Sequence, residues 1–156
     1  YFPDKRLLFM EVARSECARQ ADAPMNLTGV CCSPQAFLTA AGRYILSVSL
    51  SEFGIRMFRI CVAESDRFPD LGRQFYESGP MQVRSKIRHY LEGAVAKGEL
   101  AIEDFDLAAD QFADLCRVDL VPRLLFNIDV SFTEAERQRV ITGAVETFLA
   151  RYGVPG

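Results

Sequence analysis

Apolar side chains recur at steps of three and four residues along nearly the whole chain, and this spacing is typical of amphipathic α-helices. Two of the clearest stripes lie before residue 100. They comprise Phe37, Leu38, Ala41, Tyr44, Ile45 and Val48, and then Val83, Ile87, Tyr90, Leu91, Ala94 and Val95. No window alternates apolar and polar residues like a β-strand bounded by hairpin turns. The pattern therefore predicts an all-α fold, a helical bundle of six to seven helices.

Capping residues mark where several of these helices begin and end. Ser33 stands before a Pro and an apolar stripe, which is typical of a helix N-terminus. Gly98 ends the stripe that precedes it. Thr133 and Glu136 have the spacing of a capping box, and the long stripe that follows them stops at Gly153. The last helix is therefore expected between Thr133 and Gly153.

The segment VDLVPRLLFNIDVSF, residues 118–132, contains enough β-branched and aromatic residues to be misread as a strand. Pro122 lies inside it, and no second segment is available to pair with it. We therefore expect a short helix followed by an apolar loop.

Length and composition are those of one globular domain. Of the 156 residues, 49% are hydrophobic and 25% are charged, so the chain can form a core and still dissolve in water. No apolar run approaches the ~20 residues that cross a bilayer, so we expect a cytoplasmic protein without a membrane segment. A net charge of −3 and a pI near 5.2 make this chain alone a poor ligand for DNA phosphates.

The five cysteines show no metal-binding or disulfide pattern. No pair has CxxC spacing, and neither a metal nor another cofactor is expected. Cys31 and Cys32 are adjacent in an expected loop and could sense oxidants, but the loop has no basic side chain to activate them, so chance placement is the simpler interpretation. Cys61 and Cys116 lie on apolar stripes and are expected to pack as small hydrophobic residues.

Candidate catalytic groups are few. His89 is the only histidine, and Gly93 rather than a carboxylate stands one turn later, so His89 is interpreted as a surface or pocket-edge residue. The acidic run EDFD, residues 103–106, is interpreted as a helix start, where negative charge is stabilised, rather than as a cation site. The sequence contains no phosphate loop, nucleophile elbow or HExxH motif, so no enzyme is predicted.

Aromatic and sulfur-containing residues are spread over successive helices, and helical bundles place ligand sites between facing helices. Any one of these residues could be ordinary core, but so many Tyr, Cys and Ser groups in mid-helix positions favour a retained cavity. The side chains expected to line it are Phe37, Tyr44, Phe58, Cys61, Val62, Ile87, Tyr90, Phe112 and Cys116. Its character favours an uncharged or weakly polar ligand, with Tyr44, Tyr90 or His89 forming hydrogen bonds.

The opening YFPDK, followed by LLF, resembles the junction of TetR-family transcriptional repressors at which the helix-turn-helix DNA reader ends and the fourth helix begins. Residues 59–80, RICVAESDRFPDLGRQFYESGP, resemble a segment of the AefR-like branch of that family, where an Ala-Glu pair precedes Arg-Phe-Pro and then Phe-Tyr. KGEL at residues 97–100, with the acidic run and the Ala-Ala helix after it, also fits. The resemblance covers essentially the whole chain.

The resemblance implies a particular organisation. Residues 1–5 would be the end of a missing N-terminal DNA-binding domain, and residues 6–156 the effector-binding and dimerisation domain. Tyr1 and Lys5 match positions that contact operator phosphates in the family. Operator DNA would therefore be bound only through the missing domain.

The resemblance also implies a homodimer through the helices that begin at Asp104 and Thr133, and isologous pairing is the commonest oligomer symmetry. The expected interface residues are Phe105, Ala109, Val140, Ala144, Val145 and Phe148. The expected function is that of a ligand-responsive transcriptional repressor. A small hydrophobic effector bound in each subunit would move the fourth helix and so change the separation of the DNA readers.

Three other functions stay open at this point. A small-molecule or lipid carrier would share the pocket but need no DNA reader. An enzyme would require a polar group of residues around His89, and a thiol-based regulator would depend on Cys31 and Cys32. The sequence identifies neither the effector nor the operator, and it does not separate repression from activation.

Overall fold

The computed structural model describes residues 33–155, and in this part of the chain it contains seven α-helices and no β-strand. The helices are α2 (Pro34–Leu50), α3 (Glu52–Glu64), α4 (Pro69–Ser78), α5 (Pro80–Ala96), α6 (Phe105–Leu115), α7 (Leu120–Leu125) and α8 (Glu134–Tyr152). The predicted all-α fold is confirmed. The expectations for Tyr1, Lys5, Cys31 and Cys32 fall outside the described residues.

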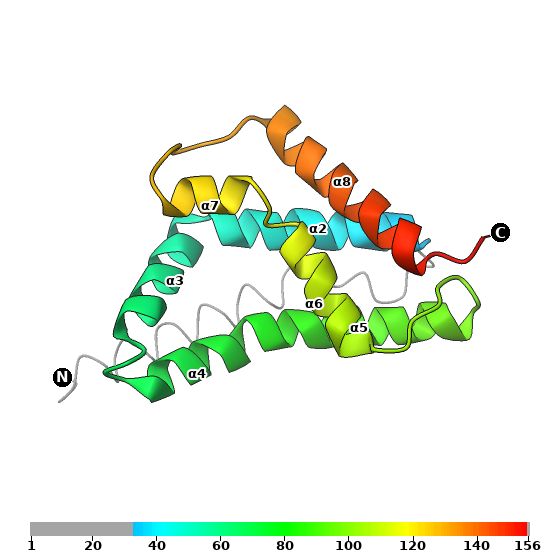
Figure 1. Ribbon diagram of the computed structural model, residues 1–156, viewed down its shortest axis with the longest axis horizontal. Coiled ribbons are helices and arrows are strands. Elements are labelled where there is room, and N and C mark those ends of the chain that lie inside the picture. Colours follow the sequence, from blue (N-terminus) through cyan, green and yellow to red (C-terminus); the bar gives the residue numbers. More distant parts are fainter. Residues whose placement is uncertain (1–32, 156) are drawn as a thin grey trace.

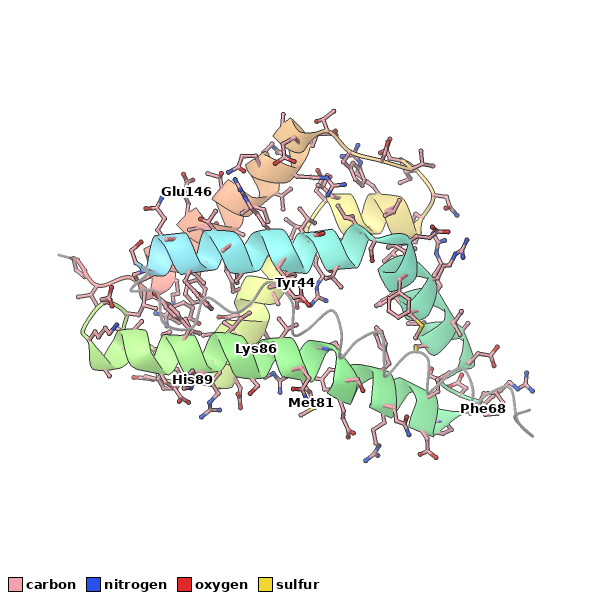
Figure 2. The ribbon with its side chains drawn as sticks, turned by 180° about the vertical axis from the view of Figure 1, so that it is seen from behind. Tyr44, Phe68, Met81, Lys86, His89 and Glu146 are labelled. Carbon is pink, nitrogen blue, oxygen red and sulfur yellow. The ribbon has the colours of Figure 1, made fainter. Side chains whose placement is uncertain are left out.

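The helices are arranged in two layers. In Figure 1, α6, α7 and α8 lie in front of the layer formed by α2, α3, α4 and α5, and the order is reversed in Figure 2, which shows the molecule from behind. α2 packs against α8, and α5 packs against α6. α6 also contacts α8 and α2, so it joins the two layers.

The described residues form two separate apolar clusters. The main core takes most of its buried side chains from α2, α5, α6, α7 and α8, and it includes the fully buried Leu38, Ile87 and Phe112. A smaller cluster, which we call the corner cluster, lies between α3 and α4. It comprises Met57, Cys61 and Leu71, with Phe53, Phe68 and Phe75 packed against them. The α3–α4 corner therefore has a core of its own.

The predicted helix ends are confirmed by their hydrogen bonds. The Ser33 hydroxyl accepts a bond from the amide of Ala36 at 3.2 Å. Thr133 and Glu136 form a complete capping box at the start of α8. Gly98 follows α5 with a φ of 77°, a left-handed conformation that glycine adopts without steric cost. Residues 118–132 form the short helix α7 and a loop, as predicted.

Ser51 caps both helices at the α2–α3 joint. Its hydroxyl donates to the carbonyl oxygen of Val48 at 2.7 Å and accepts from the amide of Gly54 at 3.0 Å. A Cβ atom at Gly54 would lie only 2.2 Å from the same carbonyl oxygen. The joint therefore requires glycine at this position, and it sets the direction in which α3 leaves α2.

Candidate functional site

α2 presents aromatic side chains toward α5. Phe37 stacks on Tyr90 of α5, with ring centroids 3.8 Å apart and ring planes within 7° of parallel. Tyr44 lies two turns further along the same face of α2, and Figure 2 shows it on the edge of α2 that faces α5. Ile87 is fully buried one turn before Tyr90. Phe37 and Tyr90 are thus in direct contact between α2 and α5, and the other two predicted ligand-binding side chains, Tyr44 and Ile87, belong to the same main core.

Two further predicted residues, Phe112 and Cys116, lie deeper, where α6 meets α2 and α8. Phe112 packs edge to face against Phe148 of α8, with centroids 5.5 Å apart and ring planes at 79°. The Cys116 thiol lies close to Gly42 of α2, where an added Cβ would be 3.2 Å from the sulfur. Burial raises the pKa of Cys116 to about 12, so its thiol stays neutral. Cys116 therefore packs as a small hydrophobic residue, as predicted.

The predicted residues on α3 are separate from this group. Cys61 is buried, but it belongs to the corner cluster with Met57 and Leu71. Phe58 and Val62 lie on the outer side of α3, where they are 44% and 61% exposed. The described structure therefore does not bring these three α3 side chains next to Phe37 and Tyr90.

An open pocket of about 670 Å³ runs along α2, and this volume is within the range of small-molecule sites. Its described lining residues are Ser33, Gln35, Ala36, Thr39, Ala40, Arg43, Tyr44 and Ser47. Of these described residues, Tyr44 alone was predicted from the sequence, because the predicted lining consisted of aromatic and other apolar side chains. The signal for the others was a run of small and hydroxyl-bearing residues at steps of three and four beside the apolar stripe of the same helix.

Arg43 gives this lining a positive charge and connects it to the other layer. Its Nη2 donates to the side-chain oxygen of Gln138 on α8 at 2.8 Å, and the Gln138 amide nitrogen donates to the hydroxyl of Thr142 at 3.0 Å. The pocket thus combines an aromatic ring, hydroxyl groups and a guanidinium. Such a lining suits a small molecule with an apolar body and a hydrogen-bond acceptor.

The predicted interface residues on α6 and α8 face inward. Phe105 packs against the main core, and the other five side chains are buried in it. Those five are Ala109, Val140, Ala144, Val145 and Phe148. The outer face of α8 is instead exposed at Thr142, Gly143, Glu146, Thr147 and Ala150. A Cβ at Gly143 would meet no atom of residues 33–155 within 4 Å. A second subunit packing on these helices would therefore contact their outer faces.

The acidic run forms a helix cap and an ion pair, and the histidine lies on the surface. Asp104 caps α6 by accepting a hydrogen bond from the amide of Leu107 at 3.0 Å, as predicted for a helix start. Asp106 forms an ion pair with Arg88 at 2.8 Å. His89 is exposed, and Figure 2 shows it on the edge of α5 that faces away from α2.

Among residues 33–155, no group of three or more His, Cys, Asp and Glu side chains is arranged to hold a metal ion. Of the helices α2 to α8, none is both long and apolar enough to cross a bilayer.

Several solved structures share this helical arrangement. The chain is 27% identical to a TetR-family regulator of Mesorhizobium loti MAFF303099, with a TM-score of 0.86 over 98% of this chain and 77% of that one. It is 29% identical to the flavonoid-responsive regulator FrrA, with a TM-score of 0.79 over 100% of this chain and 79% of that one. A TetR-family regulator of Pseudomonas syringae pv. tomato DC3000 shares the fold at 19% identity, with a TM-score of 0.68 over 99% and 76% of the two chains. No curated protein sequence matches significantly.

Residues 36–154 match the family described as AefR-like transcriptional repressor, C-terminal domain. Because the match spans most of the chain, the protein belongs to this family, and the resemblance inferred from the sequence is confirmed. Its relatives are TetR-family transcriptional regulators, which are dimeric, bind small-molecule effectors and operator DNA, and are generally not enzymes.

Proposed function

We propose that this chain is the effector-binding and dimerisation domain of a ligand-responsive transcriptional repressor. The main support is the family match over residues 36–154, in a domain with an open pocket of about 670 Å³ beside Tyr44. Operator DNA would be bound by a separate DNA-reading domain, in keeping with the match of this chain to the C-terminal domain of its family. Because it acts on operator DNA, the protein would work in the cytoplasm.

The proposed effector is a small, mostly apolar molecule with at least one hydrogen-bond acceptor. Ala36, Ala40 and the Tyr44 ring would contact its apolar body, and Arg43 would bind the acceptor. FrrA, which is 29% identical to this chain, is a flavonoid-responsive regulator. Planar phenolic compounds are therefore the first class to test.

The proposed signal passes through α2, which packs against both α8 and other helices of its own layer. An effector that binds Arg43 competes with Gln138, whose oxygen now accepts from that guanidinium at 2.8 Å. Loss of this bond would favour a different position of α2 relative to α8. A difference of ~1–3 kcal/mol in effector affinity between the two positions is the usual size of such coupling.

The proposed homodimer would form through the outer faces of α6 and α8. Gly143 supports this proposal, because a glycine in the middle of a helix costs about 1 kcal/mol relative to Ala and no atom of the described chain lies where its Cβ would be. Close approach of a partner helix would explain the missing side chain.

The test uses the full-length repressor on its own upstream DNA, with phenolic compounds screened for release of the complex. A compound that releases the wild-type protein should also raise the thermal midpoint of the 156-residue chain. Arg43→Ala should need at least about tenfold more compound, which corresponds to ~1.4 kcal/mol. The control is Arg56→Ala, since Arg56 is exposed and pairs with Glu52 on the surface of α3.

Other results would change the assignment. If Arg43→Ala responds like the wild-type protein, the effector binds elsewhere in the domain. If the full-length protein ignores DNA at every salt concentration while the chain still binds a compound, the protein is a carrier.

A further inference from the structure

The loop between α7 and α8 holds its large apolar side chains outward. Phe126, Ile128 and Val130 are 77%, 68% and 87% exposed, the highest values among the exposed large hydrophobic residues of the described chain. We call these three side chains the connector surface. They alternate with Asn127 and Asp129, so the loop has an apolar outer side and a polar inner side.

The inner side of this loop is bound to the rest of the domain. Arg123 binds the carboxylate of Asp129 through Nε at 2.8 Å and Nη2 at 2.7 Å. The amide of Ile128 donates to the carbonyl oxygen of Arg123 at 2.9 Å, and Asn127 accepts a bond from Arg59 of α3 at 3.2 Å. The polar residues therefore fix the loop in a shape that keeps its apolar side chains in water. Contiguous exposed apolar residues of this kind mark interaction sites.

The connector surface belongs to the same layer as α6 and α8. Figures 1 and 2 both place α6, α7 and α8 on the same side of α2 and α5, and the loop joins α7 to α8. The loop runs directly into the first turn of α8 at Thr133. It is therefore continuous with the helices proposed above to form the dimer.

Those helices offer few large apolar side chains to a partner. The exposed residues on the outer face of α8 are small or polar, and on α6 the exposed large hydrophobic residue is Leu107, at 51%. Stable interfaces bury about 800 Å² on each partner around a centre rich in aromatic and large apolar groups. TetR-family regulators are dimeric, so their interface needs an apolar centre of this kind. In the layer of α6 and α8, the connector surface can supply that centre.

We propose that Phe126, Ile128 and Val130 pack against a second copy of this chain and form the main apolar anchors of the dimer. This inference rests on the proposed homodimer, and it adds which residues hold the dimer together. Two-fold symmetry would present each anchor twice. The small residues on the outer face of α8 would let the partner approach closely enough for both loops to be covered.

The test is the dimer dissociation constant of the 156-residue chain, measured by sedimentation equilibrium over a dilution series. Phe126→Ser should raise this constant about 30-fold, the loss expected for one aromatic anchor, and the triple variant with Ile128→Ser and Val130→Ser should be monomeric at the same concentrations. Met81→Ser is the control, because Met81 is also exposed, at 40%, but lies on α5 in the other layer. Its dissociation constant should equal that of the wild-type chain.

A second measurement avoids substitutions altogether. In the wild-type chain, amides of residues 126–132 should exchange more slowly with deuterium at concentrations above the dissociation constant than below it. If the triple variant dimerises as tightly as the wild-type chain and the loop shows no concentration-dependent protection, the anchor assignment is wrong. The proposed homodimer would still stand. A wild-type chain that stays monomeric at all concentrations overturns both. An equal loss in Met81→Ser would show that the effect is not specific to the connector surface and would also count against it.

Discussion

Arg84 on α5 and Asp110 on α6 form a two-point ion pair, in which Nε donates to Oδ1 at 2.8 Å and Nη2 donates to Oδ2 at 2.5 Å. The hydrogen bonds to Asp110 raise the pKa of Arg84 above its usual range. One turn away along both helices, Arg88 binds Asp106. The two pairs lie across the junction of the layers, so they help to fix the position of α6 relative to α5.

Replacing Asp110 by Asn should therefore weaken the α5–α6 contact. Because Asp110 is 44% exposed, water and salt screen the pair, and we expect a loss of only ~0.5–1 kcal/mol in the free energy of unfolding. Urea titrations at 0.05 M and about 1 M NaCl measure it, and the loss should shrink at high salt. The control is Asp114→Asn, because Asp114 forms a longer ion pair, with Arg117 at 3.7 Å. A loss equal to that of the control would show that the pair contributes nothing.

Cys116 should make stability fall at alkaline pH. Its pKa is raised from 9.0 to about 12 by burial, so above pH ~9 the unfolded thiol loses its proton while the folded thiol keeps it. The unfolded state then binds fewer protons, and each pH unit between ~9 and ~12 should remove ~1.4 kcal/mol of stability. At lower pH this contribution is fully present.

The check is urea unfolding of the wild-type chain and Cys116→Ala at pH 7, 9 and 10. At pH 7 the variant should be about 1–2 kcal/mol less stable, because it leaves a small cavity. The difference in unfolding free energy between the two proteins should narrow by about 1 kcal/mol between pH 9 and 10. Because both proteins share all the other titrating groups, this change reports on the Cys116 thiol alone. A gap that stays constant over this range would contradict the buried, neutral thiol.

Two Gly→Ala substitutions should have opposite effects. Gly54→Ala places a methyl group 2.2 Å from the backbone oxygen of Val48, so the α2–α3 joint must move, and we expect a loss of ~1–3 kcal/mol. The added methyl group of Gly93→Ala, on α5, meets no atom of the described residues within 4 Å, so this variant should gain ~0.5–1 kcal/mol of stability through helix propensity. Thermal unfolding monitored by circular dichroism compares them. Equal effects of the two substitutions would mean that the joint adapts without cost.

Arg59 should hold the end of α7. Its Nη2 donates to the carbonyl oxygens of Leu124 and Leu125 at 3.0 and 2.7 Å, which are acceptors left open at a helix C-terminus. Arg59→Ala should therefore speed amide exchange in residues 124–129 at least about fivefold, with little change in α5. Arg56→Ala, one turn earlier, is the matched control. Unchanged exchange in the loop would show that Arg123 holds it alone.

Local features were predictable from the sequence because their causes are local. The Ser33 and Thr133 side chains bond to amides only three residues later, and Gly98 follows closely after the end of α5. The spacing of these residues along the sequence was therefore enough to predict the helix ends. Pro122 likewise excluded a strand. The whole-chain periodicity then determined the all-α class.

The functional residues were harder to predict, because an apolar stripe on a helix does not indicate whether the same chain, a ligand or a partner packs against it. Val140, Ala144 and Phe148 were assigned to a dimer, yet the chain's own core already buries them. Cys61 and Val62 are neighbours on α3, but a rotation of about 100° between adjacent helical residues puts one inside and the other in water. The pocket along α2 was missed for another reason, since small and hydroxyl-bearing residues look like an ordinary solvated helix face.

The corner cluster divides the domain into parts of unequal stability. Its six apolar side chains come from α3, α4 and the residues next to them, whereas the main core draws on five helices. Local opening in proteins follows such divisions, because a region with fewer buried contacts opens at a lower free energy. Within the described part of the chain, we therefore expect the α3–α4 corner to open at a lower free energy than the five-helix core, so that the corner can rearrange while the larger core keeps its shape.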